Sequence, residues 1–373
     1  MPFDDAATRS AVDKSLASPP QRTQHLLGNL RDTLRGRLPA RRVDENVLVG
    51  TWNIRCFGDL NEQWHARSTD QPMRDLESLR CIAEIVSHFD VVAVQEVRAN
   101  MKALRHMMKA LGPDWGFILT EVNRGRAGND ERMAFVFDTR RAKPSGLAGE
   151  LTLPERVRKN SPDFARRPYA VSFRCGAQTL VLVTLHIRFG QPEDRLPELL
   201  GIAEWLRDWA KTESEWGHNL IVLGDMNIGS EEDPLYKAFT STGLRPPAEL
   251  RKVPRTVFTS DTRDAFYDQI AWFHEEDGNG RGHRPVLSMR FTGNAGFVDF
   301  GGPILSARRM SLHDLSWRIS DHYPLWVEFA TDPATDPAAD TAAHTAAASA
   351  TATAAHTATA DHAAGPRRRA NRG

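Results

Sequence analysis

Short apolar runs that end in polar residues recur along the chain between residues 44 and 329. The clearest run, Ile221-Val222-Leu223-Gly224, is followed by Asp225 and Asn227. Three further runs and one strand start show the same arrangement: Val47–Trp52 before Asn53 and Arg55, Val91–Val94 before Gln95 and Glu96, Leu180–Leu185 before His186, and Asp321-His322 ahead of Leu325–Phe329. Runs of this length predict buried β-strands whose polar side chains lie at the strand ends.

Helical patterns separate these strands. Residues 73–88 and 197–211 carry apolar side chains at the three-to-four-residue spacing of an amphipathic helix. Strands that are apolar along their whole length, alternating with such helices, predict an α/β fold. We expect two mixed β-sheets packed face to face, with helices outside.

The two ends of the chain differ from the middle. Residues 1–43 form a polar leader with one candidate helix at 22–37, whose Leu26, Leu27, Leu30 and Leu34 recur at helical spacing. This helix is expected to dock on the main domain, or to be part of a frayed leader. Residues 44–332 form the domain, and the Ala/Thr-rich residues 333–373 are predicted to be disordered because they cannot bury enough apolar surface.

Charge, cysteine content and the absence of apolar targeting segments limit the kinds of protein that this chain can be. The 373 residues carry no formal net charge, so overall charge does not indicate nucleic acid, although a local basic groove is compatible with it. The three cysteines, Cys56, Cys81 and Cys175, form no disulfide framework or zinc motif. No membrane span or signal peptide is recognised, which predicts a cytoplasmic protein and leaves nonclassical export open. We also expect a monomer.

Carboxylates, amides and histidines at strand ends indicate a metal-assisted hydrolytic site. Glu96 is the candidate metal ligand, and Asn53 would orient the metal or the scissile phosphate. The alternatives are a Glu96–Arg98 surface pair and strand-end turns in which Asn53, Asp225 and Asn227 bond to the backbone.

His186 and His322 are the acid–base candidates, because imidazole titrates near neutrality. Glu131 and Asp268 are the acids placed to orient them. Asp321 adjoins His322, so its side chain is expected to diverge from the imidazole and to contact metal or water. Arg166 is a candidate phosphate ligand, with Arg167 as its competitor.

The order of these motifs resembles the endonuclease/exonuclease/phosphatase superfamily, most closely its DNase I-like branch. The motifs are Thr51–Arg55, Gln95–Arg98, Asp130–Arg132, Leu185-His186, Gly224–Asn227, Tyr267–Ile270 and Ser320–Pro324. The resemblance implies a four-layer α/β/β/α sandwich. It also implies a Mg²⁺ or Mn²⁺ site, with Ca²⁺ as a further possibility, at Glu96 with help from Asn53 and Asp321.

The resemblance further implies roles for the remaining residues. His186 would be oriented by Glu131 and His322 by Asp268, while Asp225, Asn227 and Arg166 would hold the phosphate. One departure is Asn129, which stands where DNase I-like enzymes carry a tyrosine two residues before the acid.

The function expected from these residues is that of a metal-dependent phosphodiesterase, a DNase I-like endonuclease acting on DNA with little sequence preference. Arg124, Arg126 and Arg132 are candidates for the rim that meets DNA. The alternatives are a phosphatase or phosphodiesterase for a small or lipid phosphoester, for which Trp64 and Trp115 are candidate contacts, and a noncatalytic binding module. As a mechanism, His322 would activate water and His186 would protonate the departing 3′ oxygen, although the order could be reversed.

Overall fold

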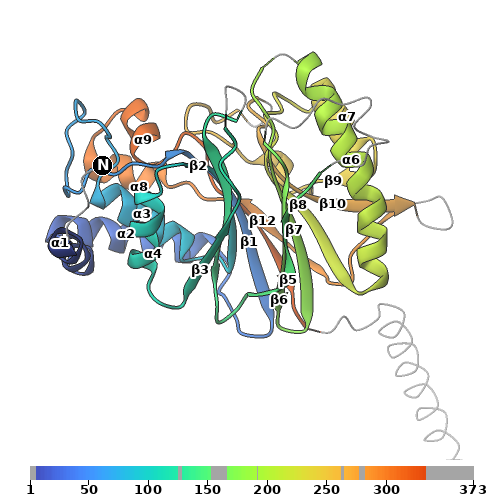
Figure 1. The fold of residues 1–373 in the computed structure, drawn as a ribbon, viewed down its shortest axis with the longest axis horizontal. Helices are drawn as coiled ribbons and strands as arrows, with labels where there is room; N and C mark the ends of the chain where they lie inside the picture. The colour runs from blue at the N-terminus through green and yellow to red at the C-terminus, as the bar shows by residue number, and fades with distance from the viewer. Residues whose placement is uncertain are drawn as a thin grey trace, which may run out of the picture. The chain divides into compact units, whose positions relative to one another are not determined.

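Two mixed β-sheets packed face to face form the framework of the computed structural model (Figure 1). The structure describes residues 6–124, 128–152, 166–190, 192–261, 264–276 and 282–332. The first sheet has the order β12-β13-β1-β2-β4-β3. Its strands are β1 (Asn46–Phe57), β2 (Val91–Arg98), β3 (Trp115–Leu119), β4 (Glu131–Asp138), β12 (Phe291–Phe297) and β13 (Leu325–Ala330).

The second sheet has the order β11-β10-β8-β7-β6-β5, with β9 paired to β10. Its strands are β5 (Lys143–Glu150), β6 (Tyr169–Cys175), β7 (Gln178–His186), β8 (His218–Asp225), β9 (Leu244–Arg245), β10 (Asp268–Glu276) and β11 (His283–Pro285). Each sheet contains one parallel pair, β1–β2 in the first and β7–β8 in the second. The other described pairings are antiparallel.

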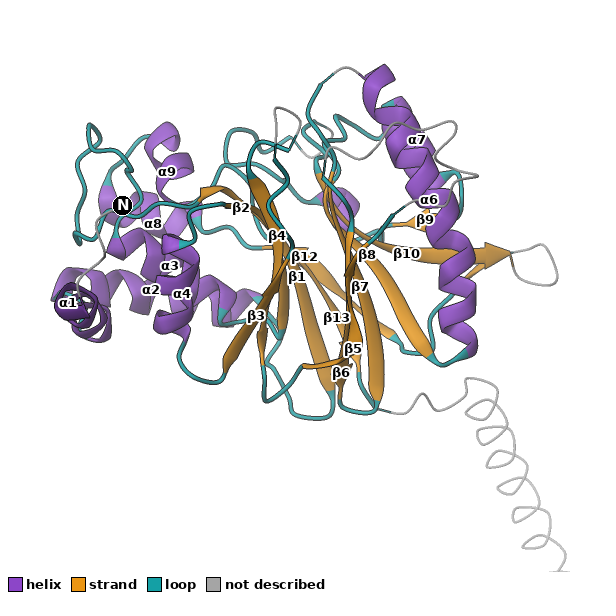
Figure 2. Cartoon of the chain, viewed as in Figure 1, coloured by secondary structure: helices purple, strands orange, loops and turns teal. Residues whose placement is uncertain are grey.

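Helices cover the outer face of each sheet (Figure 2). On the side of the first sheet lie α1 (Ala6–Ala17), α2 (Gln21–Arg37), α3 (Leu76–Val86), α4 (Lys102–Leu111), α8 (Gly301–Arg308) and α9 (Leu312–Arg318). On the side of the second sheet lie α6 (Pro192–Glu215) and α7 (Pro234–Thr240). The predicted four-layer α/β/β/α sandwich is confirmed.

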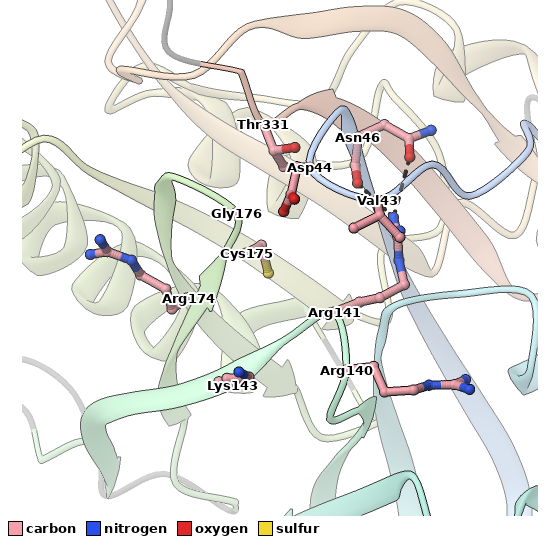
Figure 3. A pocket seen from close by; sticks show the side chains of 10 residues that line it. All are labelled: Val43, Asp44, Asn46, Arg140, Arg141, Lys143, Arg174, Cys175, Gly176 and Thr331. Atoms are coloured by element: carbon pink, nitrogen blue, oxygen red, sulfur yellow. Dashed lines mark hydrogen bonds between the residues drawn. The ribbon is translucent and has the colours of Figure 1, made fainter.

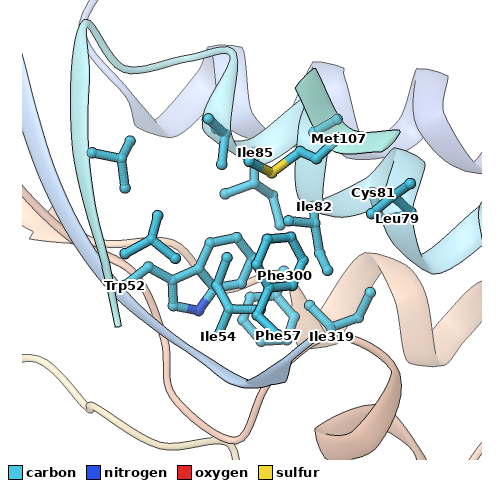
Figure 4. Packing of buried hydrophobic residues seen from close by; sticks show 14 of the residues in the cluster. Trp52, Ile54, Phe57, Leu79, Cys81, Ile82, Ile85, Met107, Phe300 and Ile319 are labelled. Atoms are coloured by element: carbon cyan, nitrogen blue, oxygen red, sulfur yellow. The ribbon is translucent and has the colours of Figure 1, made fainter. Parts of the chain in front are cut away.

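The core is divided between the layers because each central strand is buried on both faces. In β1, Val47 and Val49 pack between the two sheets, whereas Leu48 and Trp52 pack against the helices. Figure 4 shows Trp52 among the helix-side residues, close to Phe300. A strand with two buried faces reads as a continuous apolar run, which is why the strands were recognisable in the sequence.

Several predicted boundaries were wrong. The strands expected to stop before Asn53 and before Gln95 instead continue to Phe57 and Arg98. Both contain register shifts, between Asn53 and Phe57 in β1 and between Val94 and Val97 in β2. These irregularities let polar residues continue a strand beyond its apolar run. The helix expected at 73–88 is shorter, because Asp75 caps α3 by accepting a hydrogen bond from the Ser78 amide at 2.8 Å.

The N-terminal helix α2 packs against α3. Its apolar positions Leu26, Leu27, Leu30 and Leu34 are buried. Arg31 binds the Glu84 carboxylate with two nitrogens, at 2.8 and 2.7 Å. The tail predicted at 333–373 lies outside the described residues. Among the helices that the structure describes, none has the length and apolarity needed to cross a membrane.

Replacing Leu30 with alanine is expected to lower the free energy of unfolding by about 2–5 kcal/mol. Leu30 is fully buried in α2, so truncation leaves a cavity between this helix and the domain. Denaturant unfolding would measure the change, with Leu312→Ala as a control, because Leu312 is 41% exposed. An unchanged midpoint for Leu30→Ala would contradict the packing described here.

Candidate active site

The first sheet brings four of the predicted site residues to one of its edges. β1 and β2 are parallel, so Asn53 and Glu96, both late in their strands, lie toward the same end. β4 and β13 run antiparallel to them, so Glu131 at the start of β4 and His322 just before β13 lie at that end too. Strand direction alone therefore gathers segments that are far apart in the chain.

Strand direction also brings the predicted site residues of the second sheet to one end of that sheet. His186 ends β7 and Asp225 ends the parallel β8, and the two residues are partners in the register. Asp268 opens the antiparallel β10 directly opposite Asp225. Arg166 precedes β6, which runs antiparallel to β7. Each of the ten site residues predicted from the sequence is at or beside these strand ends.

Asn53 links the two sheets through its side-chain amide. Its Nδ2 donates to Glu96 Oε1 at 3.2 Å and to Asp225 Oδ2 at 2.9 Å. Its Oδ1 is buried and, among the described residues, has no hydrogen-bond partner. A buried acceptor without a hydrogen bond destabilises the fold, so we expect this oxygen to bind a ligand.

Glu96 adopts an unusual backbone conformation. Its φ of +61° lies in the left-handed region, within the irregular part of β2. The carboxylate accepts from the Cys56 amide at 2.7 Å and from Asn53, while the nearest Arg98 nitrogen is 3.9 Å away. Strain at a non-glycine residue is commonly retained where a side chain must be aimed at a functional position.

His322 is paired with Asp268. Its Nδ1 lies 2.7 Å from Asp268 Oδ2, and its backbone carbonyl accepts from Trp52 Nε1 at 2.8 Å. Burial by itself lowers the pKa of His322. The charge and hydrogen bond of Asp268, with the charges of Asp225 and Asp321, outweigh burial and raise the pKa to about 10.

His186 is in the opposite electrostatic situation. Its Nδ1 lies 3.3 Å from Glu131 Oε2 and its Nε2 lies 3.7 Å from Asp225 Oδ2. The Glu131 contact does not meet hydrogen-bond geometry, and His186 Nδ1 is one of the buried atoms without a described partner. Burial, followed by the positive charges of Arg166, His322 and Arg98, holds the pKa of His186 well below its usual value.

Glu131 is surrounded by donors. Asn129 Nδ2 donates to Oε1 at 2.6 Å, Arg98 approaches Oε1 at 3.3 Å, and Arg166 Nε approaches Oε2 at 2.7 Å. Burial and the charge of Glu96 nevertheless raise the pKa of Glu131, against the lowering effect of the two arginines. The sequence did not predict that Arg98 contacts Glu131. It offered Arg98 as a partner of Glu96, but the Arg98–Glu96 distance of 3.9 Å is longer than the Arg98–Glu131 distance of 3.3 Å.

Asn129 shows what the departure from the DNase I-like pattern does. The residue has a φ of +55°, a conformation that asparagine tolerates better than most residues. Its amide supplies a hydrogen bond to the acid two positions later. The position therefore still supports Glu131, but with a small polar group instead of an aromatic ring.

Arg166 makes a contact that the sequence did not predict. It is buried and forms an ion pair with Glu131, although Nε and Nη1 lack good hydrogen-bond geometry with any described group. Arg167 is exposed and lies 3.5 Å from Glu150. A phosphate contact by Arg166 remains a prediction.

Asp225 and Asn227 form the strand-end turn that the sequence offered as an alternative for their motif. The Asn227 amide donates to Asp225 Oδ1 at 2.9 Å, which is the expected turn contact, and Asn227 Nδ2 donates to the Ile187 carbonyl at 2.6 Å. The other Asp225 oxygen faces Asn53 and His186. Burial and the charge of Asp268 raise the pKa of Asp225 to about 6.

Asp321 forms an ion pair with Arg55. Its Oδ2 lies 3.5 Å from Arg55 Nη1, and the Arg55 guanidinium stacks over the Trp317 ring at 3.9 Å. Ser320 holds this segment on β1 by donating to the Asn53 carbonyl at 2.6 Å. Arg55 was quoted in a sequence motif but not assigned a role, and its contact with Asp321 places it at the site.

The residues proposed for substrate rims are only partly placed. Arg126 lies outside the described residues, and Arg132 donates to the carbonyls of Arg98 and Ala99. Trp64 and Trp115 are half-buried against the helix-side core, so neither forms an apolar loop for lipid.

A cavity of about 200 Å³ at the opposite end of β1 is a poor candidate for the chemistry (Figure 3). Arg140 is bound to Asp138 and Arg141 to Asp90. Figure 3 shows the Arg174 side chain directed away from the other labelled groups. Arg140 and Arg141 therefore compensate the charges of buried acids of the fold.

A comparison with known protein families shows to which family this chain belongs. Residues 50–322 match the Endonuclease/Exonuclease/phosphatase family. The chain belongs to this family. This match confirms the resemblance that the ordered motifs indicated. Because members of the family hydrolyse phosphoester bonds, the protein is a phosphoester hydrolase by family. No curated protein matches the chain in sequence.

The chain is also similar to several solved structures at low sequence identity. An endonuclease/exonuclease/phosphatase family protein from Bacteroides thetaiotaomicron is 17% identical, with 77% of this chain and 98% of that chain covered and a TM-score of 0.47. A mannosyl-6-phosphatase from the same organism is 17% identical (76% and 99% covered, TM-score 0.48). D. rerio TDP2, solved with a single-strand DNA product, is 13% identical (76% and 98% covered, TM-score 0.48).

The pKa of His322 provides a test of the Asp268 pairing. In NMR titration, its imidazole is expected to lose its proton near pH 10 rather than near 6.5. Because the folded-state pKa is raised, the pairing stabilises the fold fully below pH 6.5, and this contribution is lost as the pH rises toward 10. Asp268→Asn should bring the pKa down sharply, since burial remains and the charge is gone; an unchanged pKa would contradict the assignment.

Proposed function

We propose that this protein is a metal-dependent phosphodiesterase, a DNase I-like endonuclease that cleaves DNA with little sequence preference. The observation that carries the proposal is the pair of imidazoles, His322 on Asp268 and His186 beside Glu131, on either side of Asp225. Asp225, Asp268 and His322 each offer a ligand atom within 4.8 Å of the others. The two imidazoles therefore serve a single reacting group.

The donor set fits a hard divalent cation such as Mg²⁺ or Mn²⁺. Glu96, Asp321 and the orphaned Asn53 Oδ1 offer oxygen ligands, and Asp268 Oδ1 is also buried without a described partner. Asp225 and Asp268 lie close together beside His322, and their two carboxylates can contribute further oxygen ligands. A bound cation would screen the phosphate charge and stabilise the charge that develops in the transition state.

The protonation states support an order of proton transfer that reverses the one expected from the sequence. His186 is held neutral by burial, so it suits the base that takes a proton from water. His322 is held protonated by Asp268, so it suits the acid that protonates the departing 3′ oxygen. In-line attack with this leaving group gives a 5′-phosphate product.

The buried donors around Glu131 support a positioning role for that acid. Asn129, Arg98 and Arg166 fix the carboxylate 3.3 Å from His186 Nδ1, so a small rotation of the ring would bring the pair into hydrogen-bond geometry. Arg166 has unsatisfied nitrogens, so a phosphate oxygen would complete its hydrogen bonding.

A second candidate function is hydrolysis of a small phosphomonoester. The observation in its favour is Asn129, which removes the aromatic group that DNase I-like enzymes present beside the acid. The test is to compare hydrolysis of supercoiled plasmid DNA and of small phosphomonoesters by the purified chain with Mg²⁺ or Mn²⁺. Cleavage of plasmid with weak monoester turnover is the expected result; the reverse preference would replace the endonuclease proposal by the phosphatase.

A further inference from the structure

Two exposed phenylalanines lie on segments that contact the site, Phe189 three residues after His186 and Phe258 in a turn bridged to His322. Phe189 is 83% exposed and Phe258 is 51% exposed. In the described part of the chain, large apolar side chains are exposed at six positions: Val43, Phe117, Phe189, Trp216, Phe258 and Leu312. A solvent-facing aromatic ring beside a hydrolytic site is a feature that folding does not require.

Phe189 belongs to the His186 side of the site. The Ile187 amide donates to the Asp225 carbonyl at 2.9 Å, and its own carbonyl accepts from Asn227 Nδ2 at 2.6 Å. Phe189 follows Ile187 by two residues, so their Cα atoms are at most about 7 Å apart. The ring is thus tethered next to the Asp225–Asn227 motif.

Phe258 belongs to the His322 side. The backbone of Thr256 forms bridges with His322 and with Thr259, which makes 256–259 a tight turn at the catalytic histidine. Val257 is buried in the core, and its amide donates to the Asp321 carbonyl at 2.9 Å. Phe258 is exposed while its neighbour Val257 is buried, so the turn separates these two side chains.

We infer that Phe189 and Phe258 are stacking surfaces for the bases of single-stranded DNA on the two sides of the scissile phosphate. The inference rests on the proposed endonuclease function and names its preferred substrate. Bases stack on aromatic side chains without regard to sequence, which agrees with cleavage of little sequence preference. In a duplex the base faces are already stacked on each other, so unpaired strands are favoured.

The distribution of the two rings argues against a membrane partner. Phe189 lies between Arg188 and Gly190, and Phe258 is followed by Thr259 and Ser260. Single rings on separate segments do not form the contiguous apolar patch that membrane insertion needs. Two separated flat surfaces suit two separate planar groups of one substrate.

The test compares two single-stranded substrates in the presence of Mg²⁺. One is oligothymidylate, and the other is the same strand with tetrahydrofuran abasic units on both sides of the cleaved phosphate. The measured quantity is the kcat/KM for intact oligothymidylate divided by the kcat/KM for the abasic strand. Phe189→Ala and Phe258→Ala are each expected to lower this ratio about 5- to 100-fold. Phe189→Leu and Phe258→Leu, which keep apolar bulk without an aromatic face, should lower it as well.

Trp216→Ala is the matched control. Trp216 is 76% exposed and lies two residues before β8, at the strand end opposite Asp225, so its loss should leave the ratio unchanged. Circular dichroism melting of every variant reports whether it is folded.

Three results would overturn the inference. The first is a ratio near one for the unaltered protein, and the second is equal ratios in the protein and in folded Phe→Ala variants. The third is binding to phosphatidylcholine vesicles that Phe189→Ala and Phe258→Ala abolish, which would assign the rings to a membrane. Failure to cleave any DNA strand would instead remove the endonuclease proposal, and this inference with it.

Discussion

Replacing His322 with alanine is expected to lower the turnover of a phosphodiester substrate about 10²- to 10⁴-fold. The imidazole is kept protonated by Asp268, and its removal takes away the proposed acid for the leaving oxygen. Steady-state kinetics with Mg²⁺ at saturation would measure the loss in kcat. His186→Ala is expected to cause a loss of the same order, through loss of the base.

His218→Ala is the matched control for both histidine variants. His218 Nδ1 lies 2.6 Å from Glu213 Oε2, so this residue also forms a histidine–carboxylate pair, but at the start of β8. It is expected to retain nearly full turnover. Loss of less than about tenfold in both His322→Ala and His186→Ala would contradict acid–base roles for these residues.

Glu96→Ala is expected to reduce turnover about 10³-fold at a Mg²⁺ concentration that saturates the unaltered protein. A catalytic metal contributes several kcal/mol, and each 1.36 kcal/mol corresponds to a factor of about ten in rate. Raising the concentration of Mg²⁺ or Mn²⁺ should recover part of the loss, because the remaining ligands still attract the ion. Calorimetric titration would show the weakened metal binding directly.

The control for Glu96→Ala is Glu213→Ala, because both carboxylates are 19% exposed and Glu213 lies at the end of α6. This variant should bind metal as tightly as the unaltered protein. If Glu96→Ala keeps both its metal affinity and its turnover, the strained carboxylate is a structural group and the metal lies elsewhere, with the Asp225–Asp268–His322 group as the next candidate.

The sequence was sufficient for the architecture because the central strands are buried on both faces. The strands around Val91–Val94 and Ile221–Leu223 therefore appear as unbroken apolar runs, and the polar residues after them mark the edge where the site forms. Strand direction then brings Glu131 and Asp268, which open antiparallel strands, to the same edge as His186 and Asp225.

The details that the sequence did not provide depend on long-range geometry. The bulges in β1 and β2, the φ of +61° at Glu96 and the contact of Arg166 with Glu131 arise only after the sheets have formed. The acid and base roles that we propose for the two imidazoles could not be assigned from the sequence either, because they depend on burial and on the charges around each ring. The acid beside each ring is more than 50 positions away in the chain, Asp268 for His322 and Glu131 for His186.

The central claim, that one cation-dependent pocket hydrolyses phosphodiester bonds, is tested most directly by the relaxation of supercoiled plasmid by the purified chain. With Mg²⁺ or Mn²⁺, we expect conversion to the nicked form, abolished by chelator and by Asp225→Ala, and retained in His218→Ala. Plasmid that stays supercoiled with either metal, or that is nicked equally well by Asp225→Ala, would contradict the account.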